Sequence, residues 1–210
     1  MDNLVCINEI KISNAGYIRC KSSFYELDVL LPTDSYQYVF KKGKNIINCE
    51  IDSPEVAISY LLSMRIKNKK NILFCEKSAY VNNQKISLNR ILKYSCYIDE
   101  INPFFSKKHT VRHLISKGIK NSKMQLTVEQ IAEMFKLTDR IDKPIKATGN
   151  EKYQAMVAIA FAYGKQIFCF PWFSKKRTEY YAERIRYLLN VLDEYKKIVI
   201  IPKTGDGGVS

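Results

Sequence analysis

The stretch from Lys146 to Ser174, KATGNEKYQAMVAIAFAYGKQIFCFPWFS, decides the fold. Its TGN triplet, Thr148 to Asn150, supplies a glycine turn, and the small and apolar residues after Glu151 are typical of a helix. The apolar run QIFCF follows this helix and predicts a buried strand. The stretch therefore predicts a turn, a helix and a strand in direct succession.

The flanking segments extend this stretch into an α/β fold. TEYYAERIRYLLNVLDEY, which starts at Thr178, predicts a long helix with one apolar face, and KIVIIP predicts a final strand. Upstream, NIINCEI (Asn45 to Ile51) predicts a short buried strand, and SPEVAISYLLSM predicts a helix with Ser53 as its cap and Pro54 at its first position. Because the late strand–helix–strand pattern implies parallel strands, we expect an α/β fold with a mixed or parallel sheet.

The first third of the chain is predicted to be mostly β. LVCINEIKI (Leu4 to Ile12), FYELDVLL (Phe24 to Leu31) and YQYVF have the apolar pattern of strands, and NILFCEK and LKYSCYI predict two more. TVRHLISKGI and TVEQIAEMFKL predict helices instead, the second opened by a capping box of Thr127 and Gln130.

We expect these elements to form one domain over residues 1–210. A helical subdomain at about 101–160 is inserted in the α/β core, and the glycine-rich residues 204–210 form a flexible tail.

Composition excludes two classes of protein. A chain of 210 residues, 46% of them hydrophobic, buries a full core, so disorder is not expected as its main state. The N-terminal MDNLVCINEIKISN lacks the basic start and apolar run of a signal peptide, and no apolar stretch approaches the roughly 20 residues of a membrane span. The six cysteines form no CxxC pair, which predicts buried reduced thiols rather than a zinc site.

The formal charge of +13 fits nucleic acid, an anionic membrane surface or an acidic partner, and does not choose among them. The lysine clusters KKGK, RIKNKK, SKKHTVRH and SKKR are typical of a solvated face. The chain also has 14 tyrosines and 10 phenylalanines, which put rings near some of these clusters and would suit RNA or single strands. The Asn-, Lys-, Ile- and Tyr-rich composition is typical of an AT-rich genome, such as that of a low-GC bacterium.

Histidine and cysteine offer no clear catalytic or metal centre. His109 and His113 are four residues apart and would share one helix face as a metal pair, but no third ligand is evident, so no metal is expected. The scattered cysteines lack an electropositive surrounding that would favour a Cys–His catalytic pair.

Several stretches resemble, in order, the motifs of the ATP-binding subunit of ABC transporters. ATGNEKYQAMVAIAFA resembles the family's signature helix, with Thr148 and Gly149 in place of its serine and first glycine, and KQIFCFPWFS falls on the Walker B strand. KYSCYIDEINPFFSKKHTVRHLI resembles the Q-loop segment, KKGKNII the lead-in to the Walker A loop, and KIVIIPK the strand before the switch histidine. The resemblance spans nearly the whole chain and implies a P-loop-NTPase-like core of the ABC nucleotide-binding-domain type with a helical subdomain.

The residues that this family uses to hydrolyse ATP have no counterparts here. A Walker A loop needs glycines, a lysine and a serine or threonine, whereas NCEIDSPEVAISYLL has no glycine and no GK[ST]. It carries acidic residues that would repel a triphosphate: Glu50, Asp52 and Glu55. The other positions also lack the required groups: Pro171 for the Walker B aspartate, Trp172 for the catalytic glutamate, Glu100 or Asp99 for the Q-loop glutamine, and Lys203 for the switch histidine.

The resemblance therefore implies a pseudo-ATPase without catalytic residues, metal or cofactor. Trp172 and Phe173 are expected to fill the vacated pocket with apolar mass. In the family, two nucleotide-binding domains sandwich ATP head to tail, so Thr148, Gly149 and Asn150 are candidates to contact ATP bound to a partner. The same three residues also fit an ordinary N-capped helix.

The function implied is that of a catalytically inactive, nucleotide-binding-domain-like subunit of a bacterial ABC transporter. Such a subunit is cytoplasmic, peripheral on the inner face of the cell membrane, and pairs with membrane subunits and/or a competent ATP-binding subunit in a hetero-oligomer. Two alternatives stay open: a regulatory or scaffold pseudo-ATPase outside transport, and a basic nucleic-acid-binding protein. Salt-sensitive binding to random DNA or RNA would favour the last, and capture of membrane subunits the first.

Overall fold

The computed structural model describes six segments of the chain: residues 8–13, 16–31, 37–63, 78–105, 108–137 and 139–205. At the centre is a sheet of four parallel strands, which confirms the expected α/β fold. Its strands, in spatial order, are β5 (Gly43–Asn48), β10 (Ile198–Lys203), β9 (Ile167–Cys169) and β8 (Ser95–Tyr97).

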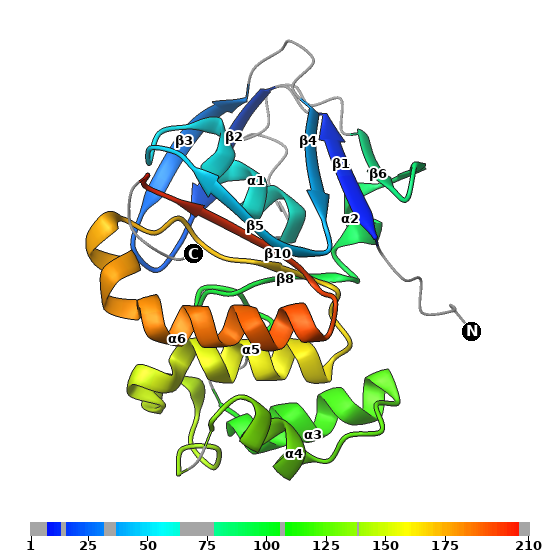
Figure 1. Ribbon diagram of the computed structural model, residues 1–210, viewed down its shortest axis with the longest axis vertical. Coiled ribbons are helices and arrows are strands. Elements are labelled where there is room, and N and C mark those ends of the chain that lie inside the picture. The colour runs from blue at the N-terminus through cyan, green and yellow to red at the C-terminus, as the bar shows by residue number, and fades with distance from the viewer. Residues whose placement is uncertain are drawn as a thin grey trace.

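Helices cover both faces of this sheet (Figure 1). On one face lies α1 (Pro54–Ser63), and on the other lie α5 (Lys152–Ala162) and α6 (Lys175–Glu194). The side chains of β10 alternate between the two faces of the sheet. Ile198 and Ile200 pack in the core with α1, whereas Val199 and Ile201 pack in the core with α5 and α6. A strand buried on both faces is apolar throughout, and KIVIIP has that pattern.

Antiparallel strands from the first part of the chain lie beyond α1 (Figure 1). One sheet has the order β4-β1-β6-β7, and β2 and β3 form a separate hairpin. Their bounds are β1 (Glu9–Ser13), β2 (Gly16–Lys21), β3 (Glu26–Leu31), β4 (Gln37–Lys41), β6 (Ser78–Val81) and β7 (Gln84–Ile86), and the short helix α2 (Leu88–Ile91) follows.

Two further helices, α3 (Val111–Ser122) and α4 (Val128–Met134), lie on the far side of α5 (Figure 1). Thr110 caps α3, and the capping box of Thr127 and Gln130 opens α4 as predicted. Between α4 and α5 lie two 3-10 turns, Ile145–Ala147 and Gly149–Glu151. These helices fall within the predicted subdomain of about 101–160, whose boundaries stay a prediction, as does the flexible tail.

The predicted strand NILFCEK at 71–77 and residues 4–7 of the first predicted strand lie outside the described segments, in which β1 runs from Glu9 to Ser13. Two other predicted boundaries were wrong. Strand β5 ends at Asn48 rather than Ile51, because the chain turns there and Ser53 N donates to the carbonyl of Glu50. The last helix begins at Lys175 rather than Thr178, because the hydroxyl of Ser174 caps it.

Gly118 of α3 packs closely against the C-terminal end of α5. A Cβ at this position would lie 2.7 Å from Cδ2 of Tyr163 and 2.9 Å from the carbonyl carbon and the Cβ of Ala162. We therefore expect Gly118→Ala to lower the free energy of unfolding by about 1–3 kcal/mol, despite the better helix propensity of alanine. Urea unfolding measures this loss. Lys117→Ala, at an exposed position of the same helix, is the control, and equal stability of the two variants would contradict the close packing.

Candidate functional site

The carboxyl ends of the parallel strands meet at one edge of the sheet, the edge to which β10 points in Figure 1. In open α/β sheets this edge is where ligands bind. The loop Cys49–Ser53 follows β5, Asp99 and Glu100 follow β8, Pro171 and Trp172 follow β9, and Lys203 ends β10. The structure thus brings together the positions that correspond, by the sequence resemblance, to the motifs of an ATP site.

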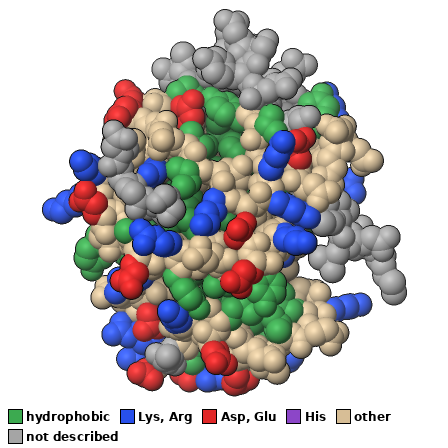
Figure 2. All heavy atoms as spheres, viewed as in Figure 1, with side chains coloured by type: hydrophobic (Ala, Val, Ile, Leu, Met, Phe, Trp, Pro, Cys, Tyr) green, Lys and Arg blue, Asp and Glu red, His purple; other side chains and the backbone are tan. Residues whose placement is uncertain are grey.

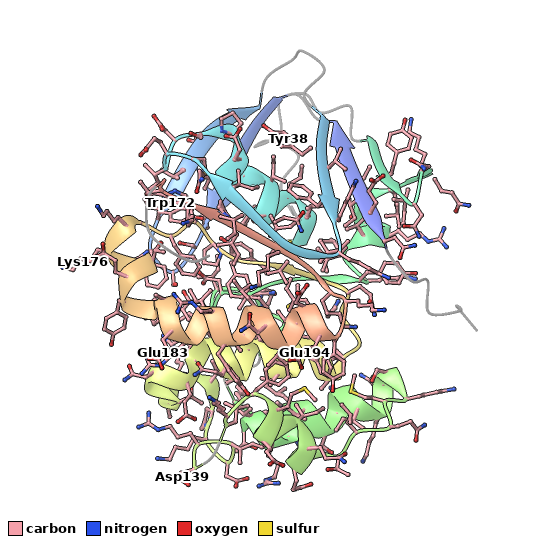
Figure 3. The ribbon with its side chains drawn as sticks, in the orientation of Figure 1. Tyr38, Asp139, Trp172, Lys176, Glu183 and Glu194 are labelled. Atoms are coloured by element: carbon pink, nitrogen blue, oxygen red, sulfur yellow. The ribbon has the colours of Figure 1, made fainter. Side chains whose placement is uncertain are left out.

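Trp172 fills the space beside the loop after β5. Its Nε1–H donates to the carbonyl oxygen of Cys49 at 3.0 Å, and its own backbone N–H donates to the hydroxyl of Tyr25 at 3.0 Å. The rings of Trp172 and Tyr25 meet edge to face with centroids 6.5 Å apart, and only 8% of Trp172 is exposed. Trp172 is labelled at this edge of the sheet in Figure 3. Trp172 therefore supplies apolar mass at the expected place, whereas Phe173 is buried on the other face of the sheet, in the core with α5 and α6.

Tyr25, which sequence reasoning missed, reaches this edge from the turn between β2 and β3. Its hydroxyl also lies 3.4 Å from the hydroxyl of Tyr97 on β8. Burial raises the pKa of Tyr25 to about 12, so the phenol stays protonated at neutral pH. The sequence carries no signal for this contact because Tyr25 and Trp172 are 147 residues apart.

The loop after β5 offers carboxylates where a phosphate-binding loop offers N–H groups. Cys49 N donates to the carbonyl of Lys203 at 2.8 Å, so the loop is joined to the end of β10. Glu55 stands in the first turn of α1 and accepts from the hydroxyl of Tyr38 at 3.2 Å. A carboxylate at a helix N-terminus occupies the position that an anionic ligand favours.

Asp99 connects the end of β8 to the β2–β3 turn. Its carboxylate accepts from the backbone N–H of Ser23 at 3.1 Å, from the Ser23 hydroxyl at 3.1 Å and from the N–H of Ile101 at 3.0 Å. Burial raises the pKa of Asp99, of which only 1% is exposed, although these hydrogen bonds act in the opposite direction. Glu100, next in the chain, pairs with Lys152 at 3.2 Å instead. Neither side chain is a glutamine-like donor aimed at the site.

Lys203 and Phe173 continue the pairing of β9 with β10 beyond the ends of the strands. Phe173 N donates to the carbonyl of Pro202 at 3.0 Å, and Thr204 N donates to the carbonyl of Phe173 at 3.0 Å. Lys203, at the position of the switch histidine, is buried. This backbone pairing holds the segment after β9 against the sheet.

The candidate residues for contact with a partner differ in how far they are exposed. Thr148 is fully buried, and its hydroxyl donates to the carbonyl of Ile145 at 2.6 Å, while its own carbonyl accepts from Arg140. Gly149 has φ +57 and is the first residue of a 3-10 turn, and α5 begins after this turn at Lys152, next to the predicted start at Glu151. Gly149 and Asn150 are exposed, and they are the part of this triplet that a partner can reach.

His109 and His113 stack on each other, with ring centroids 4.4 Å apart, and both side chains are exposed. Within the six described segments, no cluster of three or more His, Cys, Asp or Glu side chains is placed to hold a metal ion. In the same segments no helix is both long enough and apolar enough to cross a membrane.

The cysteines near the site are expected to resist alkylation in the native protein. Burial raises the pKa of Cys20, Cys49 and Cys96 to about 12 and that of Cys169 further, so almost no thiolate forms at neutral pH. These four thiols are free, and Cys6 and Cys75 lie outside the described residues. Iodoacetamide labelling read by mass spectrometry should modify the four only after unfolding in urea. Fast native labelling of Cys49, the least buried of them, would contradict the packing around Trp172.

Comparisons with known proteins agree on the fold. No protein-family model and no curated protein matches the chain. Among solved structures, a protein described as an ABC transporter ATP-binding protein from Pyrococcus furiosus matches with a TM-score of 0.59 and 13% identity, over 94% of this chain and 92% of that one. cbiO1 from Clostridium perfringens, part of the ABC transporter complex cbiONQ, matches with a TM-score of 0.58 and 17% identity, over 95% and 79%.

A third match is a dimeric post-hydrolysis state of the ATP-binding cassette MJ0796 bound to ADP and Pi, with a TM-score of 0.57 and 16% identity, over 94% of this chain and 88% of that one. At these identities the similarity establishes the fold alone. The chain has an α/β fold like that of ABC transporter ATP-binding domains.

Proposed function

We propose that this chain is a catalytically inactive subunit of a bacterial ABC transporter, built on the fold of its ATP-binding domains. It lies at the cytoplasmic face of the membrane and pairs with membrane subunits, with a competent ATP-binding subunit, or with both. The similar structures support this general assignment, because cbiO1 is described as part of a transporter complex and MJ0796 as a dimer.

One observation carries the inactivity: the indole of Trp172 donates to the carbonyl of Cys49, between the loop after β5 and the end of β9. These are the two places from which an ATP-binding domain supplies its phosphate loop and its acids. In this chain the buried ring of Trp172 joins the loop after β5 to the end of β9. Binding a triphosphate would require this ring to leave and several carboxylates of the loop to be neutralised, which is unfavourable.

The direct test is nucleotide binding by the purified chain. With magnesium and ATP in excess, we expect no change in melting temperature, because a ligand stabilises the folded state only in proportion to its occupancy. A saturable rise in melting temperature, or hydrolysis of ATP, would overturn the proposed inactivity.

Affinity capture from mildly solubilised native cells tests the other part of the proposal, which is that the chain is a subunit of a transporter complex. Recovery of a multi-span membrane protein supports the transporter assignment, and recovery of soluble chains alone favours a regulatory or scaffold protein.

The nucleic-acid alternative receives less support from the surface. On the face shown in Figure 2, Lys and Arg side chains are interspersed with Asp and Glu, so no continuous basic stripe crosses that face. A protein that binds the phosphate backbone of a nucleic acid places its Lys and Arg side chains along such a stripe. Absence of DNA or RNA binding already at low salt would agree with this conclusion, whereas salt-sensitive binding would favour the nucleic-acid alternative.

Asn150→Glu tests the predicted contact with a partner's ATP. Asn150 is exposed, so the change should leave the fold intact while placing a carboxylate where the γ-phosphate of a partner would lie. We expect ATPase activity of a captured complex to fall about tenfold, the effect of roughly 1.4 kcal/mol on the barrier. The control is Asn121→Glu, the same change at an exposed position on α3. Equal activity of the two complexes would reject this contact.

A further inference from the structure

A surface of basic and exposed aromatic side chains lies at the N-terminal end of α6. We call it the basic–aromatic surface, and it consists of Phe24, Lys175, Lys176, Arg177 and Tyr180. Phe24 is 41% exposed and Tyr180 is 63% exposed, which makes Tyr180 the most exposed large hydrophobic residue among those described. Figure 3 shows Lys176 at the edge of the molecule, at the end of α6 nearest the plugged site.

Contacts between α6, the β2–β3 turn and the 3-10 turn Gly149–Glu151 hold the side chains of this surface in place. The guanidinium carbon of Arg177 lies 3.4 Å from the ring centroid of Phe24, which joins α6 to the β2–β3 turn. The hydroxyl of Tyr180 lies 3.4 Å from Oδ1 of Asn150, and its ring packs edge to face on Tyr181 at 4.8 Å. Because these side chains are already ordered, a partner that binds them gives up less conformational entropy.

The three cations of this surface are joined by one exposed carboxylate, Glu179 in the next turn of α6, so the surface keeps a net positive charge. None of Lys175, Lys176 and Arg177 is in an ion pair with a described residue. All three stand in the first turn of a 20-residue helix that has no acidic residue in that turn. Basic side chains there are unfavourable because they add to the positive end of the helix dipole. The helix alone therefore gives no reason for these cations, whereas an acidic partner does.

We propose that the basic–aromatic surface binds an acidic surface of a different protein chain and disfavours association with a second copy of this chain. In a two-fold symmetric dimer the same patch meets itself, so a contact centred here would bring six cations together. A partner rich in Asp and Glu removes this repulsion, and the exposed ring of Tyr180 supplies the apolar contact that interface centres use. Binding to an acidic protein chain is inferred from these contacts alone, and only the identification of that chain as the competent ATP-binding subunit rests on the proposed function.

A protein partner fits these residues better than a lipid or nucleic acid. Arg177 covers the ring of Phe24, so this ring is held against the protein rather than directed outward for insertion between lipids. The three cations form a compact group at one helix end, not a stripe that follows a phosphate backbone.

The experiment places a photo-cross-linking phenylalanine analogue at Tyr180 of the full chain in native cells. The same position is then examined in two charge-reversal variants. One is Lys175→Glu, Lys176→Glu, Arg177→Glu. The control has an equal change in net charge at exposed positions of α3 and its C-cap: Lys117→Glu, Lys120→Glu, Lys123→Glu. Glutamate in the first turn of α6 favours the helix, so an unchanged or higher melting temperature will show that the first variant folds.

The expected result is a cross-link to a protein peptide of net negative charge, lost in the first variant and kept in the control. The partner so identified, once purified, should bind the first variant about tenfold more weakly than the unmodified chain. A cross-link to nucleic acid, to lipid or to a second copy of this chain would overturn the inference, as would one that survives charge reversal.

The outcome also separates this inference from the proposed function. An acidic partner that carries a GK[ST] motif supports both. An acidic partner without any ATP-binding motif, together with no membrane protein in the affinity capture, supports the inference and overturns the transporter assignment.

Discussion

Replacement of Trp172 by alanine is expected to lower the free energy of unfolding by about 3–5 kcal/mol, the usual cost of removing a buried aromatic ring. The ring is 8% exposed and packs edge to face on Tyr25, so its removal leaves a cavity between the β2–β3 turn and the loop after β5. The carbonyl of Cys49 also loses its indole donor. Guanidinium unfolding followed by circular dichroism measures the loss, because Trp172 is the only tryptophan and its fluorescence disappears with it.

Trp172→Phe separates the ring from its hydrogen bond. Phenylalanine keeps most of the aromatic mass but cannot donate to Cys49, so we expect it to cost about 1–2 kcal/mol. If the alanine variant were no less stable than the phenylalanine variant, the ring would not be a packed part of the core. In either variant we expect no ATP hydrolysis, because opening the pocket restores neither a phosphate loop nor an acid.

The order of elements could be predicted from the sequence because each element carries its own local pattern. Local apolar runs predicted β9 and β10, and a local capping box predicted the start of α4. None of these predictions needed information from residues distant in sequence. The start of α6 was placed too late because three basic residues oppose a helix N-terminus, yet the cap from Ser174 outweighs them. Local signals therefore compete, and sequence alone does not weigh them.

The interior of the candidate site was only half predictable. Pro171 and Trp172 could be recognised as replacements for acids because the surrounding strand keeps its pattern. The partners of Trp172 could not be recognised, since Tyr25 comes from a hairpin distant in sequence. Thr148 was a candidate N-cap, but it ends the 3-10 turn Ile145–Ala147 in an αR conformation, and its hydroxyl donates back to the carbonyl of Ile145. Contacts between distant segments, rather than propensity, decide such positions.

Asp99 should give the second-largest effect. Asp99→Ala leaves the part-buried N–H groups of Ser23 and Ile101 without their acceptor, so we expect a loss of about 2–4 kcal/mol in the free energy of unfolding. Asp99→Asn is the matched control, because its amide oxygen still accepts from both N–H groups through the Oδ1 position. We expect it to cost less than about 1 kcal/mol at neutral pH. Urea unfolding of the three proteins measures both differences.

The pH dependence of stability shows whether burial or hydrogen bonding dominates the pKa of Asp99 in the folded protein. Burial raises the pKa of Asp99 in the folded protein above its value in the unfolded chain, so the folded state binds this proton more readily. Its stability therefore rises as the pH falls through the raised pKa, and falls again as the pH rises. Asn does not titrate, so the Asp99→Asn variant lacks this pH dependence. As the pH is lowered from neutral to mildly acidic, wild type should therefore gain stability relative to Asp99→Asn. If wild type instead lost stability relative to this variant on acidification, the hydrogen bonds from Ser23 and Ile101 would outweigh burial, and Asp99 would hold the β2–β3 turn as a stabilised carboxylate.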